Sequence, residues 1–205
     1  VMQSTESLLT VTFNVSLQKY GGDLAVGAMT ILTSVAQMVQ MPLMGLAQGA
    51  QPILSFNYGA KRPDRMKQSV RYNLMIACVF AFGVWALAML APHMLARLFA
   101  HDSALIDETA WALRIYFAVG FVAAFQNTFQ QSFVALGEAK ISLFLALERK
   151  IILLIPMILI LPHLFEDKLF AVFFAEPVAD LLAAATTTTL FLIRFRQILR
   201  RISTQ

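Results

Sequence analysis

Six long apolar runs, each bounded by a polar or basic break, constrain the fold of this chain more than any other feature. The runs cover residues 4–20, 24–46, 73–91, 110–136, 141–161 and 169–193. A helix needs about 20 apolar residues to cross the hydrocarbon core of a bilayer. Inside lipid, a helix satisfies its own backbone hydrogen bonds. We therefore predict an all-α integral membrane protein, a single bundle of six transmembrane helices spanning residues 1–205.

The composition argues against a soluble globular protein and leaves no room for a sizeable soluble domain. Of the 205 residues, 59% are apolar and 14% are charged, and the mean hydropathy is +0.69. Soluble domains are about 45–50% apolar and about 25% charged. The length leaves room for five to seven spans. With no basic leader ahead of the first run, and with Val1 as its first residue, we expect the chain to be part of a longer protein.

The basic residues predict the orientation of the helices. If there are six spans, 12 of the 16 basic residues fall on one side of the membrane. Five or seven spans would scatter them. Lys and Arg concentrate in cytoplasmic loops, so we predict a multi-pass protein of the plasma (bacterial inner) membrane with both ends cytoplasmic. The larger set is Lys61, Arg62, Arg65, Lys67, Arg71, Lys140, Arg149, Lys150, Arg194, Arg196, Arg200 and Arg201, and the smaller is Lys19, Arg97, Arg114 and Lys168. Membrane topology thus accounts for the net charge of +4 without a nucleic-acid partner.

Glycine and proline mark the predicted breaks between helices. Gly21-Gly22-Asp23 is typical of a turn that leads into a new helix. Gly45-x-x-x-Gly49 is a spacing that lets transmembrane helices approach closely. Two prolines and further glycines between residues 48 and 63 predict a loop or a broken helix end there.

Among the carboxylates inside the predicted spans, where a charge is costly and usually faces a cavity or a partner, three are candidate site residues. Glu6, in the first span, is either an interfacial residue or an ion-coupling carboxylate, because a carboxyl group removed from water can exchange a proton near neutral pH. Glu176 and Asp180 are four residues apart and share one helix face. They either share a proton or a cation, or pair with Arg149 or Lys150 of the neighbouring span.

Intramembrane amides form the other candidate set. They either bond between helices or line a wet cleft. The cleft candidates are Asn14, Gln37, Gln40, Gln126, Asn127 and Gln130. The chain offers no catalytic Ser-His-Asp order, no phosphate-binding loop and no cysteine pair. His93, His101 and His163 lack a second ligand at metal spacing. We therefore expect neither an enzyme nor a metal site.

One motif resembles a known family. Gly45-Leu-Ala-Gln-Gly49-Ala-Gln51-Pro52, followed by Asn57-Tyr58-Gly59-Ala60, is similar to the signature of the multidrug and toxin extrusion (MATE) family within the MOP flippase superfamily. The turn at Leu136-Gly137-Glu138-Ala139-Lys140 and Pro177-Val-Ala-Asp180 are also similar to that family's C-terminal half.

The resemblance implies the fold and the activity. Such proteins have twelve helices in two lobes, and this chain resembles the C-terminal six-helix lobe, with the N-terminal lobe absent. It implies secondary active efflux of cationic or amphipathic drugs in exchange for H+ or Na+, with no other cofactor. The expected partners are the missing lobe, the bilayer and small-molecule drugs. Glu6 matches a Glu of the family's seventh helix, whereas the span from Trp111 to Gly137 lacks the acid that some branches carry in helix ten.

Two alternatives stay open. A lipid-linked precursor flippase of the same superfamily would have a more cationic cleft, for which Arg114 and Arg149 are the available residues. A non-transporting membrane scaffold would need no partner lobe.

Overall fold

Long helices make up the chain in the computed structural model, which describes residues 2–203 and side chains 7–202. No strand occurs among these residues. The elements are α1 (Met2–Gly59), α2 (Pro63–Leu90), α3 (Pro92–Arg97), α4 (Ser103–Tyr116), a 3-10 turn (Gly120–Val122), α5 (Ala123–Ala135), α6 (Ala139–Leu147), a π-helical turn (Glu148–Leu154), α7 (Ile155–Leu164) and α8 (Lys168–Ser203). The all-helical prediction is therefore confirmed.

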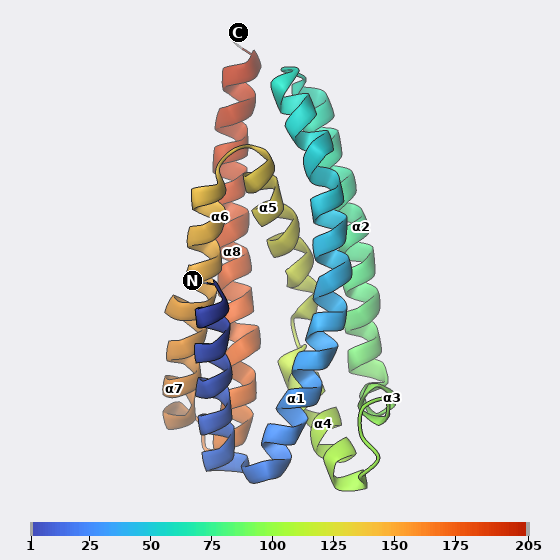
Figure 1. The fold of residues 1–205 in the computed structure, drawn as a ribbon, viewed down its shortest axis with the longest axis vertical. Coiled ribbons are helices and arrows are strands. Elements are labelled where there is room, and N and C mark those ends of the chain that lie inside the picture. The colour runs from blue at the N-terminus through green and yellow to red at the C-terminus, as the bar shows by residue number, and fades with distance from the viewer. Residues whose placement is uncertain (1, 204–205) are drawn as a thin grey trace.

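Helix α1 consists of two arms that meet at a kink, as Figure 1 shows at the lower end of the molecule. Gly22 has φ 66° and ψ −159° there, a conformation that side chains with a Cβ rarely adopt. The preceding Gly21 is tightly packed, because a Cβ on it would lie 2.7 Å from Leu169 Cδ1 of α8. The predicted break at Gly21-Gly22-Asp23 is confirmed.

The predicted loop or broken helix end between residues 48 and 63 falls at the far end of that stretch, where α1 ends at Gly59 and residues 60–62 form the turn to α2. The span predicted to end at residue 46 is therefore longer than predicted. The second arm of α1 continues through Pro42 and Pro52 to Gly59. Its 37 residues from Asp23 to Gly59 extend about 55 Å at 1.5 Å per residue, well beyond a hydrocarbon core of about 30 Å. Apolar runs alone do not show where such a helix ends, because the part of it that extends beyond the hydrocarbon core is also helical.

Two other predicted spans are interrupted. The run at 110–136 divides into α4 and α5, which are bent by 54° relative to each other. The run at 141–161 contains the π-helical turn between α6 and α7. Within the described part of the chain, three helices are long and apolar enough to cross a membrane, or four if the bent pair counts as one span.

Aromatic and aliphatic packing holds the helices together. The largest buried cluster joins α1, α4 and α8 through residues such as Leu17, Leu113 and Phe173. A second cluster fixes α5 against α8, where the rings of Phe129 and Phe191 stack with centroids 4.4 Å apart. These contacts set the frame in which the polar side chains of α1, α5 and α8 meet.

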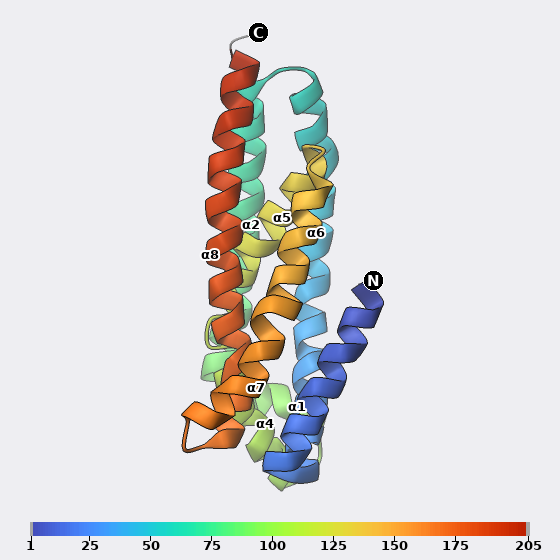
Figure 2. The ribbon, with the colours of Figure 1, turned by 90° about the vertical axis from the view of Figure 1, so that its left-hand side faces the viewer.

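The two ends of the bundle differ in charge. The turn between α1 and α2 and the C-terminal end of α8 lie at one end in both views (Figures 1 and 2). The α7–α8 loop and the kink of α1 lie at the other. Most of the basic residues belong to segments at the first end, as the charge pattern predicts. Arg149 and Lys150 are exceptions, because they lie within the π-helical turn.

Candidate functional site

A cavity of about 790 Å³ opens between the two arms of α1, α5 and the helical run 139–154. Figure 2 shows the first arm of α1 standing apart from its second arm, with the run from α6 to α7 beside them. All six predicted cleft residues line this cavity: Asn14, Gln37, Gln40, Gln126, Asn127 and Gln130. Apolar side chains such as Phe13 and Met44 complete the wall. The structure thus brings together polar groups from the two arms of α1 and from α5, which is far from them in sequence.

One amide pair also links two helices across the wall. Asn127 Nδ2 donates to Gln40 Oε1 at 2.8 Å and to the carbonyl oxygen of Ala123 at 2.9 Å. Interhelical bonds of this kind position polar groups that would otherwise be unpaired in lipid. Gln40 and Asn127 therefore hold α1 and α5 together while they face the cavity.

A buried ionic cluster lies in the same wall. Arg149 Nη2 donates to Glu176 Oε1 at 2.8 Å, and Arg149 Nε donates to Asp180 Oδ1 at 2.5 Å. The exposed fractions of the three side chains are 18%, 8% and 15%, in the order Arg149, Glu176, Asp180. Arg149 and Glu176 line the cavity together with Lys150 and Tyr116. Of the two interpretations of the acidic pair, the structure shows the ion pair with Arg149.

The local sequence explains how Arg149 reaches this position. Pro156 lies two residues after the π-helical turn and has no N–H to give to the carbonyl four residues earlier. The backbone instead makes a wider turn, in which Ile155 N–H bonds the carbonyl of Lys150. Pro177 interrupts the hydrogen bonds of α8 in the same way, next to Glu176. Both helical segments that carry the ionic cluster therefore lack part of the regular α-helical hydrogen bonding.

A second hollow, the α1–α2 groove, has a volume of about 670 Å³ and contains the family motif. Gly45, Gly49 and Asn57 line it, and a Cβ added to either glycine would find no atom within 4 Å. No part of the described chain therefore packs closely against Gly45 or Gly49. Pro52, Tyr58, Gly59 and Ala60 are exposed near the end of α1.

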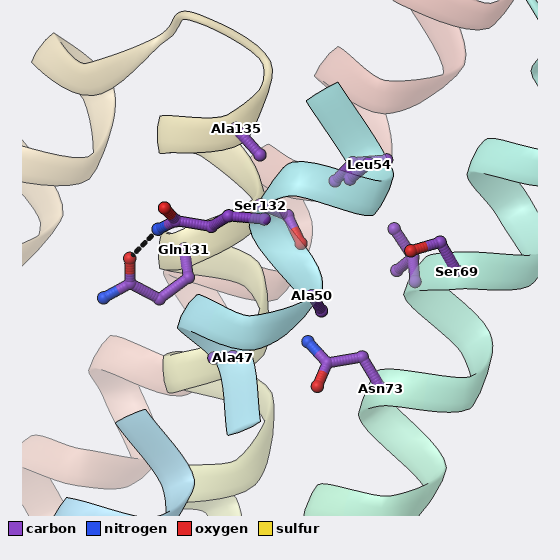
Figure 3. A pocket seen from close by; sticks show the side chains of 10 residues that line it. Ala47, Ala50, Leu54, Ser69, Asn73, Gln131, Ser132 and Ala135 are labelled. Atoms are coloured by element: carbon purple, nitrogen blue, oxygen red, sulfur yellow. Dashed lines mark hydrogen bonds between the residues drawn. The ribbon is translucent and has the colours of Figure 1, made fainter. Parts of the chain in front are cut away.

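A narrow polar seam separates the groove from the cavity (Figure 3). Gln51 Nε2 donates to Gln131 Oε1 across it, and the space is too small for a water molecule. Asn73 and Ser69 of α2 point toward the seam from the groove side (Figure 3). Gln51 of the motif thus contributes to helix packing, while the cavity takes its polar groups from other positions.

Glu6 lies outside the residues whose side chains are described, although the backbone of α1 begins at Met2. No described contact therefore tests the predicted role of Glu6 in ion coupling. Among the described residues, no group of three or more His, Cys, Asp or Glu side chains could hold a metal ion.

Sequence reasoning missed several cavity residues that a helical spacing would have found. Thr30 and Thr33 lie in line with Gln37 and Gln40 at intervals of three or four residues on one face of α1. Tyr116 gave no such signal, because it is the last residue of α4, just before the bend toward α5.

The family model, the relatives and the solved structures that resemble this chain agree on one family. The family described as MatE matches residues 1–160. The multidrug export protein MepA of Staphylococcus aureus (strain NCTC 8325 / PS 47) is 26% identical over 189 residues, which cover 91% of this chain and 40% of that protein. MepA of Staphylococcus haemolyticus (strain JCSC1435) is 23% identical over 173 residues, covering 83% of this chain and 37% of MepA.

A solved structure agrees in fold. The inward-facing conformation of a multidrug resistance MATE family transporter of the MOP superfamily superimposes with a TM-score of 0.89 at 20% identity. The match covers 96% of this chain and 45% of that one. The chain therefore spans less than half the length of the relatives it matches. Its family is one of transporters and not of enzymes, as predicted from the absence of catalytic motifs. With its fold and most of its sequence matched, the chain belongs to the MatE family.

Proposed function

We propose that the chain is the C-terminal six-helix lobe of a multidrug transporter that exports cationic or amphipathic compounds in exchange for H+ or Na+. The observation that carries this proposal is the cavity of about 790 Å³, lined by amides, in a chain whose relatives are named multidrug export proteins. A large cavity with an apolar wall and a few polar groups suits varied organic ligands.

Six membrane crossings follow if each arm of α1, α2, the bent pair α4–α5, the helical run 139–164 and α8 all cross once. The missing N-terminal lobe would then close the cavity from the other side. The basic end of the bundle would lie in the cytoplasm of a bacterium, by the positive-inside rule. Alternating access would arise from movement of one lobe against the other.

The flippase alternative has less support. Arg149 faces the cavity but is engaged by two carboxylates. Arg114 is exposed and is not among the described residues that line the cavity. The cationic surface that an anionic lipid-linked precursor requires is therefore confined to Lys150 and one neutralised arginine.

The test is an efflux assay on the protein encoded by the complete reading frame, reconstituted into vesicles with a proton or sodium gradient. We expect gradient-driven movement of ethidium, and a loss of proton-driven movement in the variant Glu6→Gln. Movement of lipid-linked precursors without any movement of ethidium would replace efflux with the flippase alternative. An unchanged proton dependence in Glu6→Gln would remove Glu6 from the coupling mechanism.

A further inference from the structure

The ionic cluster contains two carboxylates that occupy unequal positions around one guanidinium group. Glu176 lines the cavity, and Arg149 Nη2 holds it at 2.8 Å. Asp180 lies one helical turn further along α8, is bound by Arg149 Nε at 2.5 Å, and is not among the described residues that line the cavity. Of the two carboxylates bound by Arg149, Glu176 therefore lines this cavity, whereas Asp180, although its side chain is 15% exposed against 8% for Glu176, does not.

We propose that Glu176 is the binding site for the positively charged group of a transported compound, and that Arg149 fills this site while the cavity is empty. When the compound binds, its cationic group replaces Arg149 at Glu176, and Arg149 stays paired with Asp180. This inference rests on the proposed efflux function and adds to it the residue that recognises the charge.

The exchange leaves no charge unpaired. An isolated carboxylate or guanidinium at this depth would be expensive, and removing one partner of a buried pair is strongly destabilising. In the empty cavity, Arg149 serves both carboxylates. In the occupied cavity, the ligand neutralises Glu176 and Arg149 neutralises Asp180. Asp180 thus makes Glu176 available to a ligand without itself touching the cavity.

The other polar groups at the site are consistent with a single cationic group. Lys150, from the same π-helical turn, lines the cavity and lies close enough to Glu176 to interact with it electrostatically. A second positive charge on the ligand would be repelled by Lys150. Tyr116 of α4 lines the same cavity as Glu176 and adds a hydroxyl group to its polar wall.

The backbone around the cluster has the freedom that the exchange requires. The π-helical turn holds an extra residue, and such turns are frequent at functional sites. Pro177 leaves α8 without one internal hydrogen bond beside Glu176. A small movement of Arg149 away from Glu176 therefore does not break a regular helix.

The test is equilibrium binding to the protein of the complete reading frame in nanodiscs, using tetraphenylphosphonium as a cation and tetraphenylborate as an anion of the same shape. We expect Glu176→Gln to weaken tetraphenylphosphonium binding at least tenfold without weakening tetraphenylborate binding. Asp180→Asn should also weaken cation binding, because Arg149 then has no other partner. The double variant Arg149→Gln with Asp180→Asn keeps the net charge and should bind the cation more tightly than the wild type.

Three results would overturn the inference. Equal cation affinity in Glu176→Gln and wild type is one, and a double variant that binds no more tightly than the wild type is another. Displacement of tetraphenylphosphonium by millimolar Na+, with Glu176→Gln abolishing that competition, would assign the site to the coupling ion instead. If Glu176→Gln does not fold, the double variant decides alone, because it retains Glu176.

Failure of the inference and failure of the efflux proposal can be told apart. If the wild type exports ethidium but Glu176→Gln binds the cation normally, only the inference is wrong. If the wild type shows the expected binding pattern but moves no compound along any gradient, only the efflux proposal is wrong.

Discussion

The cavity and the α1–α2 groove are hollows of similar size, about 790 and 670 Å³, but they are lined by different kinds of residue. The groove holds the glycines of the motif that resembles the MATE signature, while the cavity holds the predicted amides and the ionic cluster. The residues that identify the family are therefore mostly not the residues that face the candidate ligand site.

The two walls also differ in how their polar groups are paired. In the cavity, Arg149 is bound by two carboxylates and Asn127 by Gln40. On the groove side, Asn73 is buried, and its Oδ1 has no hydrogen-bond partner among the described residues. The cavity wall is therefore held together by internal polar contacts. On the groove side, by contrast, a buried oxygen of Asn73 has no hydrogen-bond partner within the described part of the chain.

The largest effect should come from removing the guanidinium of the ionic cluster. Arg149→Leu removes the guanidinium that binds both Glu176 and Asp180, so the free energy of unfolding should fall by about 3–5 kcal/mol. Unfolding in mixed SDS micelles measures it. The matched control is Arg65→Leu at the groove, an exposed arginine whose loss should change the free energy by less than about 0.5 kcal/mol. Equal effects of the two substitutions would contradict the comparison.

The position of Arg149 shows where sequence reasoning stopped. The apolar runs predicted helical structure correctly, because burial in lipid requires it, but not where each helix ends or bends. The Gly21-Gly22 break followed from backbone chemistry. The charge pattern assigns Arg149 to the basic residues on one side of the membrane, because it lies near the start of an apolar run. Its place in a π-helical turn, facing α8, depends on Pro156 and on the packing of two helices, and the pattern of one run does not contain that packing.

The candidate site was partly predictable for the same reason. Each amide stood out by itself as a polar residue in an apolar run. That Gln40 of α1 meets Asn127 of α5 depends on the bend between α4 and α5, at residues 117–122, which no single run indicates. The length of α1 beyond Pro52 was missed because proline and glycine are read as breaks, although a helix in a membrane tolerates both.

A smaller effect, of opposite sign, should follow from filling the groove side with an apolar group. Asn73→Leu removes a buried oxygen without a partner and keeps a similar shape, so the free energy of unfolding should rise by about 1–2 kcal/mol. The same SDS titration measures the change. A loss of stability would mean that Asn73 is paired within the intact protein, and the groove would then resemble the cavity.

The amide pair of the cavity should contribute less. Asn127→Leu removes the bond to Gln40 and leaves the Gln40 oxygen without that donor, so the free energy of unfolding should fall by about 0.6–1.7 kcal/mol. The double variant with Gln40→Leu isolates the pair energy by a double-mutant cycle. Additive effects of the two substitutions would show that the bond contributes nothing and that the cavity wall is not internally paired.

The smallest effect should be at the glycines of the groove. A Cβ at Gly49 meets no atom within 4 Å, and alanine is favoured over glycine in a helix by about 1 kcal/mol at most, so Gly49→Ala should leave the free energy of unfolding unchanged or slightly higher. The matched control is Gly21→Ala, whose Cβ would lie 2.7 Å from Leu169 Cδ1 and which should be destabilising. If Gly49→Ala instead destabilises the protein of the complete reading frame as much as Gly21→Ala does, another part of that protein packs into the groove. The motif glycines would then serve a contact between lobes, and the groove would be an interface in the same sense that the cavity is a binding site.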